Sequence, residues 1–444
     1  MLQQPTMLIY MLGLYFFILS LEPFLKFKLG DFFDLIDFIF LGFFYFCYVA
    51  EKNIQGKFYK TEALFSIVIT VWIISSLIQG VSPVESVYSI FIELKYVPIA
   101  FLLLSCSIKR IHIIRFLRIS LLVIGIQWLI GFLQIVGGEQ VTLFFLNDYI
   151  LSKPEYRTSG ILQNVVSGTL LSKNFFSFII LISIVIVYKL KRFLFDERSH
   201  VPIYYMLGGV ILILVAASKT VWLLLFSVIL VVLFSEWIKR PLLLVTLMFF
   251  SLVALITVFS LSNSENSAFS FIADRFSSLF DISYYEHITT VGRITYALAT
   301  LNILSDSPLI GIGAGNWGSI VYYKLATSRE ENVLAGGYYI PKGVFQDNNL
   351  ASIAGQHGLL GFILFIVFLL KIWKNLSMIR YSHVDFDIAL FSSMRTVLFL
   401  FIVMAVTTSP FQAKPIALLF WILIGLSLAY SNALIIRKHN LVVD

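Results

Sequence analysis

Three cations set among apolar sequence are the residues best suited to do chemistry in this chain. Arg157 and Arg293 lie in polar stretches between hydrophobic runs, and Lys219 lies in a very short turn between two such runs. Arginine binds phosphate through two parallel hydrogen bonds, and lysine binds it as a point charge. The three residues therefore predict a site for an anionic ligand, and we expect them to converge on one cavity.

Asp347 and Asn348 form a second candidate group, directly before an apolar run. A carboxylate can take the proton from an attacking hydroxyl group, so Asp347 is the expected general base, with Asn348 orienting it or hydrogen-bonding a sugar. Asp347 could also cap the helix that follows, a role that aspartate fills well. The two roles do not exclude each other.

Three further residues complete the set of candidates. His357 lies about two turns into the same apolar run, where a buried polar side chain is either functional or a hydrogen-bonded core residue. Lys95 is a further candidate for binding the anion. It is spaced i, i+2 from Glu93, so the two do not pair on one helix face and each needs another partner. Glu286 is an alternative carboxylate to Asp347.

The elements that must position these residues are membrane-spanning helices. The chain of 444 residues is 59% hydrophobic and 13% charged, whereas a soluble domain keeps about a quarter of its residues charged. The apolar runs have about 20 residues, the length that a helix needs to cross a bilayer core. They are continuous rather than strictly alternating, which favours helices over a barrel. The expected fold class is an all-α integral membrane protein.

The apolar runs predict about twelve transmembrane helices. These expected spans lie near residues 7–25, 32–50, 62–80, 87–106, 119–137, 174–188, 202–218, 220–236, 242–262, 349–370, 388–407 and 413–433.

The distribution of positive charge predicts the orientation of these spans. Eighteen of the 32 lysines and arginines lie in one alternating set of connections, against seven in the short connections of the other set. Cytoplasmic loops carry the excess of lysine and arginine, so both termini are expected to be cytoplasmic. A cation such as Lys219 then opposes the bias of its own face, which favours a functional role. The alternatives are that Lys219 snorkels to lipid headgroups and that the two arginines pair with acids of their own loops.

This topology divides the chain into three parts. Residues 1–262 hold the first nine helices and an outer loop at 138–173, residues 263–348 form a large, partly helical outer loop, and residues 349–444 hold the last three helices. Within the large loop, Ala268–Phe280 has the spacing of an amphipathic surface helix and Thr290–Leu304 predicts a second helix. The glycines at 311, 313 and 315 permit tight turns or the close approach of a ligand.

Four stretches together resemble the O-antigen polymerase/ligase superfamily of bacterial envelope glycosyltransferases. They are Arg157–Gly168, the Ser218-Lys219 turn, the stretch from Arg293 to Gly315, and residues 346–361 with their Gly-Leu-Leu-Gly end. The resemblance covers most of the chain in order and implies a GT-C-like, multi-pass enzyme of the inner membrane with its active site facing the periplasm. In such enzymes the glycan is carried on undecaprenyl pyrophosphate.

Within this superfamily the residues favour a Wzy-type O-antigen polymerase. Asp347 stands where the family usually has histidine, Lys219 stands where the ligase branch usually has arginine, and the spacing from Arg157 to Gly168 resembles a polymerase loop motif. The resemblance implies transfer of a growing glycan from undecaprenyl pyrophosphate to a lipid-linked repeat unit. It also implies no cofactor, no metal and no nucleic acid, with the lipid-linked oligosaccharide, membrane lipid and a chain-length regulator protein as partners.

Two other functions stay open. The same class of enzyme includes the ligase that passes the finished glycan to lipid A-core. A flippase or another transporter of lipid-linked oligosaccharides would also have about twelve spans and cationic sites, but a transporter places its site near the membrane midplane, often at broken helices. The cations expected at the outer surface therefore favour an enzyme.

Overall fold

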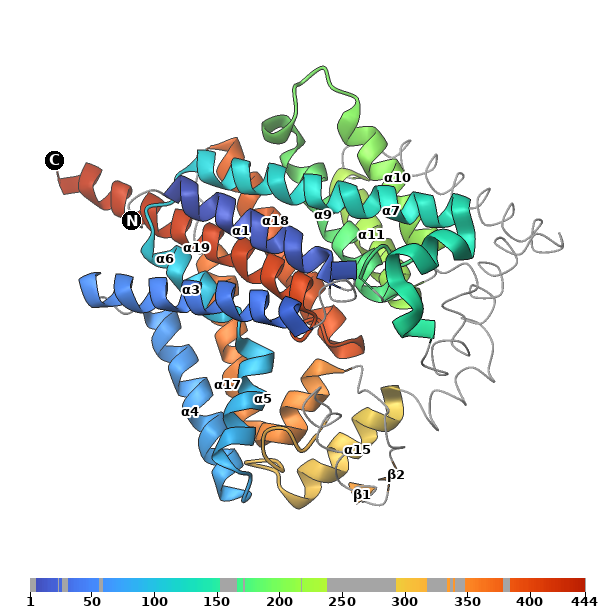
Figure 1. The fold of residues 1–444 in the computed structure, drawn as a ribbon. Helices are drawn as coiled ribbons and strands as arrows, with labels where there is room; N and C mark the ends of the chain where they lie inside the picture. Colours follow the sequence, from blue (N-terminus) through green and yellow to red (C-terminus); the bar gives the residue numbers. More distant parts are fainter. Residues whose placement is uncertain are drawn as a thin grey trace.

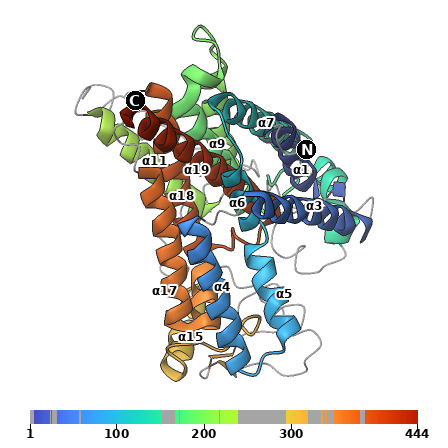
Figure 2. The ribbon, with the colours of Figure 1, turned by 90° about the vertical axis from the view of Figure 1, so that its left-hand side faces the viewer.

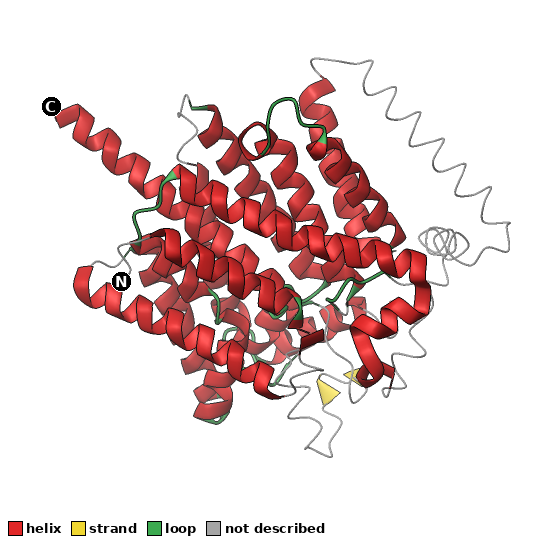
Figure 3. Cartoon of the chain, turned by 45° about the horizontal axis from the view of Figure 1, so that its top comes forward, coloured by secondary structure: helices red, strands yellow, loops and turns green. Residues whose placement is uncertain are grey.

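The computed structural model describes residues 5–22, 24–25, 31–55, 59–151, 166–170, 172–216, 218–237, 293–317, 334–335, 338–339, 348–377 and 384–443. These parts are almost entirely helical (Figure 3). The helices are α1 (Pro5–Ser20), α3 (Asp31–Gln55), α4 (Lys60–Ile78), α5 (Pro83–Leu94), α6 (Val97–Ser105), α7 (Arg110–Leu151), α9 (Lys173–Leu194), α10 (Val201–Val215), α11 (Lys219–Trp237), α15 (Arg293–Asp306), α17 (Asn349–Ser377), α18 (Asp385–Thr407) and α19 (Lys414–Val443). Two short strands, β1 (Leu334–Ala335) and β2 (Tyr338–Tyr339), pair antiparallel.

Six of the described helices are long and apolar enough to cross a membrane, and α5 with α6 makes a seventh if the bent pair is one span. The six are α4, α7, α9, α17, α18 and α19; α1, α10 and the described start of α11 are shorter apolar helices. The expectation of an all-helical, multi-pass membrane protein is therefore confirmed. The count of about twelve spans is not, because the described residues supply six or seven and the expected span at 242–262 lies outside them.

The two long loops that the sequence predicts on the outer face are only partly described. Residues 152–165 and 318–333 lie outside the described residues, as does the expected amphipathic helix Ala268–Phe280. The second expected helix of the large loop is present as α15, which ends directly before Ser307 and Pro308. Proline cannot continue a helix that needs its N–H group, which accounts for this end.

The helix α19 lies in the middle of the core. It packs against α6, α1, α17 and α18, and the run Ile416–Ile424 is almost completely buried. Aromatic rings make much of the contact, with Phe401 stacked on Phe420 at 3.9 Å between ring centroids. Gly425 allows α6 to come close, because a Cβ atom there would lie 2.6 Å from the Cα of Ala100. Small residues and tight packing of this kind hold helices together in lipid, where burial of apolar surface gives little net driving force.

A second group of helices lies at the end of the molecule away from both termini. Figures 1 and 2 show α4, α5, α15 and α17 together there, below α1, α3 and α7. The helix α4 packs against both α5 and α17, and α15 packs against α17.

Two of the expected spans are interrupted, and each of them includes a helix of this group. The expected fourth span consists of α5 and α6, which meet at an angle of 61°. Pro98, in the first turn of α6, lacks the N–H group that a continuous helix would need. The expected tenth span is α17, which is interrupted at Gly358, with φ 66° and ψ −174°. Only glycine adopts such a conformation without strain.

The chain of α17 folds back at Gly358. Asn349 and Phe365 both contact Phe411: the Asn349 side chain accepts a hydrogen bond from the Phe411 N–H at 3.1 Å, and the Phe365 ring lies 5.5 Å from the Phe411 ring. Sixteen residues of straight helix would separate them by about 24 Å. The expectation of a continuous helix over 349–370 is therefore wrong. A short segment, 349–357, precedes the helical segment 359–377, which is about 28 Å long and can cross the bilayer core alone.

A glycine-rich loop is bonded to this break through its backbone. The N–H groups of Ile312 and Gly313 donate to the carbonyl groups of Gly355 and Gln356, at 3.0 and 2.8 Å. In the other direction, the N–H groups of residues 359 and 360 donate to the carbonyl groups of residues 308 and 309. A Cβ atom on Gly311 would lie 2.4 Å from the Gly355 carbonyl oxygen. The lack of a side chain at Gly311 therefore allows the loop backbone to pack directly against the backbone of α17.

Candidate functional site

Four of the expected site residues have side chains outside the described part of the structure. Asp347, Arg157 and Glu286 lie outside the described residues. Arg293 is the first residue of α15, but its side chain also lies outside the described part. The convergence of Arg157, Lys219 and Arg293 on one cavity therefore remains a prediction.

Lys219 is the first residue of α11, and its turn is fixed to the start of α9. The hydroxyl of Ser218 accepts a hydrogen bond from the N–H of Val221 at 3.4 Å, as an N-cap does, and donates to the Asn174 side chain at 2.8 Å. This contact brings together the beginnings of two helices that each start with lysine, Lys173 and Lys219. Lys173 is a second cation beside this turn that the sequence reasoning did not single out.

Asn348 caps α17. Its side-chain oxygen accepts a hydrogen bond from the N–H of Ala351 at 2.9 Å, which is the N-cap arrangement. The capping role considered for Asp347 therefore belongs to its neighbour. Asn349 then ties the start of α17 to the turn before α19, because its N–H donates to the carbonyl of Thr408 at 3.1 Å and its side chain accepts from Phe411.

His357 is buried at the break of α17. Its ring is stacked on the indole of Trp72 in α4, with 4.0 Å between centroids and an interplanar angle of 3°. Neither ring nitrogen has a hydrogen-bond partner in the described parts of the chain. The Trp72 indole N–H donates to the carbonyl of Gly361 at 3.3 Å. The stacking joins α4 to the first segment of α17, and the Trp72 hydrogen bond joins it to the second. The observed contacts of His357 are therefore structural.

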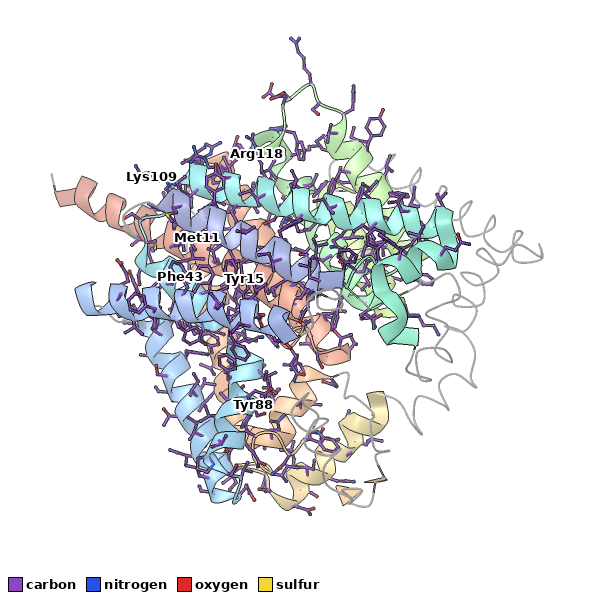
Figure 4. The ribbon with its side chains drawn as sticks, in the orientation of Figure 1. Met11, Tyr15, Phe43, Tyr88, Lys109 and Arg118 are labelled. Atoms are coloured by element: carbon purple, nitrogen blue, oxygen red, sulfur yellow. The ribbon has the colours of Figure 1, made fainter. Side chains whose placement is uncertain are left out.

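Lys95, at the junction of α5 and α6, belongs to a buried charge cluster. Its ammonium group lies 3.2 Å from a carboxylate oxygen of Asp37 in α3, and Lys414 lies 3.4 Å from the same oxygen. Lys414 also pairs with Glu22 and Asp34. Tyr15, labelled in Figure 4, donates its phenolic hydroxyl to Asp37. The cluster consists of Tyr15, Glu22, Asp34, Asp37, Lys95 and Lys414.

This charge cluster weakens the attraction of Lys95 for an anionic ligand. Its three carboxylates outnumber its two ammonium groups, and the charge of Lys95 is balanced by Asp37. A balanced cation attracts an anion less strongly than a free one. Binding of a pyrophosphate by Lys95 stays a prediction, but the partner that Lys95 needed is Asp37. No sequence signal marks this pair, because the two residues lie on helices far apart in the chain.

Glu93 lies where the broken helices meet. The carboxylate is 2% exposed, and its Oε1 accepts hydrogen bonds from the side-chain amides of Gln356 and Gln412, each at 3.4 Å. Gln356 also donates to the carbonyl of Trp317 at 2.6 Å and accepts from the N–H of Gly315 at 2.7 Å. The Gln356 side chain, in the first segment of α17, therefore connects α5 with the glycine-rich loop and Trp317. Gln356 and Gln412 carry no charge or motif that sequence reasoning would single out.

No group of three or more His, Cys, Asp or Glu side chains among the residues that the structure describes is arranged to hold a metal ion. The expectation of a reaction without a cofactor stays a prediction.

Residues 201–366 match the family described as O-antigen ligase. No curated protein matches the chain. The matched region begins at α10 and includes Lys219, Arg293, the glycine-rich loop, Asn348 and the break of α17. It does not separate polymerases from ligases. It confirms the resemblance carried by the motifs, and it assigns residues 201–366 of this multi-pass membrane protein to the O-antigen polymerase/ligase superfamily.

Proposed function

We propose that this protein is a polysaccharide polymerase. It transfers a growing glycan from undecaprenyl pyrophosphate to a repeat unit on a second undecaprenyl pyrophosphate, at the periplasmic face of a bacterial inner membrane. The observation that carries the proposal is the O-antigen ligase match over residues 201–366, within an all-helical membrane protein. Lys219 stands where the ligase branch usually has arginine, and Asp347 stands where the family usually has histidine; both departures favour the polymerase over the ligase.

The reaction breaks the bond between the anomeric carbon and the phosphate oxygen of the donor. The electron pair leaves with the pyrophosphate, where negative charge grows, and the acceptor hydroxyl oxygen forms the new bond to carbon. Cations fixed near the leaving group stabilise that charge in the transition state, the role we assign to Arg157, Lys219 and Arg293. The proton of the acceptor hydroxyl passes to Asp347 as general base.

A transporter of lipid-linked oligosaccharides is the second candidate. The junction of α5 with α6 and the break of α17 are the kind of discontinuous helices that bind substrates in transporters. The family match favours an enzyme, so we rank the transporter second.

Glycans from cells that lack this protein separate the candidates. A polymerase predicts surface glycans with a single repeat unit in place of a ladder. A ligase predicts long lipid-linked chains and no surface glycan. A flippase predicts repeat units that accumulate on the cytoplasmic side, and this last result would contradict the enzymatic proposal.

A further inference from the structure

The buried carboxylate of Glu93 is only weakly compensated by its hydrogen-bond partners. Placing a carboxylate in an apolar interior costs free energy unless strong partners compensate. The partners of Glu93 are two neutral amides, and both hydrogen bonds are 3.4 Å long, near the limit for such bonds. Lys95, the nearest cation in sequence, pairs with Asp37. An ionisable residue held this way inside a membrane protein points to a functional site.

Two oxygens at this point have no hydrogen-bond donor among the described residues. They are the second carboxylate oxygen of Glu93, Oε2, and the side-chain carbonyl oxygen of Gln412, Oε1. Glu93 and Gln412 contact each other through their remaining polar atoms. Buried polar groups in proteins are nearly always hydrogen-bonded, so a pair of adjacent acceptors calls for a ligand that brings donors.

The surrounding backbone selects the same kind of ligand. Glu93 lies in the last turn of α5, and Gln356 lies in the last turn of the first α17 segment, which ends at His357. The C-terminal end of a helix carries partial negative charge. The Glu93 carboxylate, these ends and the two acceptor oxygens together favour a ligand with O–H donors, which is the chemistry of a sugar.

The elements around Glu93 can admit such a ligand. The contacts of Glu93 with α17 and with the turn before α19 are the two long amide bonds, which sugar hydroxyls can replace at little cost. Gly358 and the junction of α5 with α6 interrupt the helices that lie beside this point. The first segment of α17 leads from this point to Asn348, beside the expected base Asp347.

We propose that Glu93 and Gln412 form a subsite that binds hydroxyl groups of the acceptor glycan, with sugar O–H groups donating to Glu93 Oε2 and Gln412 Oε1. The inference rests on the proposed polymerase function and adds the residues that recognise the acceptor. The subsite takes neutral sugar, whereas the cations take the pyrophosphate. Substitutions at the two places should therefore change different kinetic constants.

The test measures polymerisation by the purified full-length protein in lipid vesicles, with lipid-linked repeat units as substrate. E93Q keeps the size of the side chain but replaces one acceptor oxygen with a donor. We expect the KM for the acceptor repeat unit to rise at least tenfold, with kcat changed less than threefold. Inhibition by undecaprenyl pyrophosphate, which carries no sugar, should stay as in the wild type. E85Q, the same substitution at a more exposed position of α5, is the matched control and should change neither constant.

A second variant shows whether one ligand uses both oxygens. Q412M removes the carbonyl oxygen and retains an unbranched side chain of similar length. We expect it to raise the same KM, and we expect the E93Q/Q412M double variant to raise it by less than the product of the single effects, because both side chains bind one acceptor. Thermal unfolding of each variant in detergent checks that it is folded. If E93Q does not fold, Q412M alone decides the assignment.

Several results would overturn the inference. An unchanged acceptor KM in E93Q would overturn the subsite but not the proposed polymerase function. If E93Q does not fold, an unchanged KM in Q412M has the same meaning. A KM that depends on Na⁺ in the wild type and loses this dependence in E93Q would assign the two oxygens to a cation. Weaker inhibition of E93Q by undecaprenyl pyrophosphate would place the phosphate there. A wild-type protein that makes no polymer would instead contradict the proposed function.

Discussion

At the scale of single residues, the site combines groups that the structure describes with groups that remain predictions. Lys219 begins α11 next to Ser218, which is hydrogen-bonded to Asn174, the neighbour of Lys173. Asn348 caps α17. For the substitutions of Asp347 and Lys219, a structural effect can therefore be measured separately from an effect on the reaction.

Asp347→Asn should lower turnover by about 10²–10⁴-fold, since asparagine keeps the shape but cannot accept the proton. Binding of lipid-linked substrate should be largely kept, and in vitro polymerisation measures the change. The cap of α17 is Asn348, so a capping effect cannot account for a loss of turnover. Asn348→Ala is the control for that effect and should cost about 1 kcal/mol of stability. Polymerisation by the Asp347→Asn protein at close to the wild-type rate would remove Asp347 as the base.

Lys219→Ala should weaken both the binding of lipid-linked substrate and its turnover, because the pyrophosphate is charged before and after transfer. Loss of one such contact typically reduces the rate by about 10²–10³-fold. Lys219→Arg should retain most activity, since arginine also binds phosphate. Lys371→Ala, in the second segment of α17, is a control for the loss of one positive charge. Equal effects of the alanine substitutions at 219 and 371 would contradict a specific role for Lys219.

At the scale of elements, two features hold the broken helices in place. The glycine-rich loop is bonded to both sides of Gly358, and the buried charge cluster joins α1, α3 and α19 to the junction of α5 with α6. Both features fix the backbone positions of the helices around Glu93, and neither includes Glu93 or Gln412 itself.

Gly358→Ala should destabilise the protein by about 1–3 kcal/mol or more, because alanine is strained at φ 66°. Its Cβ atom would also lie 2.3 Å from backbone atoms of Leu309. Gly42→Ala is a matched control in α3, where a Cβ atom would meet nothing within 4 Å, and it should be neutral or slightly stabilising. Thermal unfolding in detergent compares the two. Equal unfolding temperatures would mean that the backbone contact at the break contributes little.

Asp37→Leu should destabilise the protein by about 3–5 kcal/mol, because it leaves the ammonium of Lys95 buried without its partner. Adding Lys95→Met should recover much of that loss, since the buried charge is then removed as well. Denaturation of the single and double variants measures the coupling. A double variant less stable than Asp37→Leu would show that Lys95 is stabilised by other groups.

At the scale of the whole molecule, both termini lie at the end away from α4, α5, α15 and α17, as Figure 1 shows. This separation agrees with a site on one face of the membrane and the termini on the other. The excess of lysine and arginine predicts that the face with the termini is cytoplasmic.

A reporter that is active only in the periplasm, fused after Asp444, should therefore be inactive, whereas a cytoplasmic reporter fused there should be active. The same pair of reporters inserted in the Lys219 turn should give the opposite result. A strong periplasmic signal from the C-terminal fusion would overturn the orientation and move the site to the cytoplasm.

The order of the residues was sufficient to predict an α-helical membrane protein and the superfamily that residues 201–366 match. Continuous apolar runs of about 20 residues require helices in a membrane, because backbone polar groups have no other partners there. Three of the four stretches that carried the resemblance, around Lys219, Arg293 and residue 350, lie within the match over residues 201–366. These properties are local, so the order of residues alone carries them.

The positions at which the helices break, and the polar residues that meet, became visible only in the three-dimensional arrangement. The apolar run at 349–370 continues through Gly358, so hydropathy could not show that the chain folds back there. The pairing of Lys95 with Asp37, and of Glu93 with Gln356 and Gln412, depends on the rotation and packing of helices far apart in the chain. Hydrophobic patterns do not encode those angles, because lipid and protein interiors are similarly apolar.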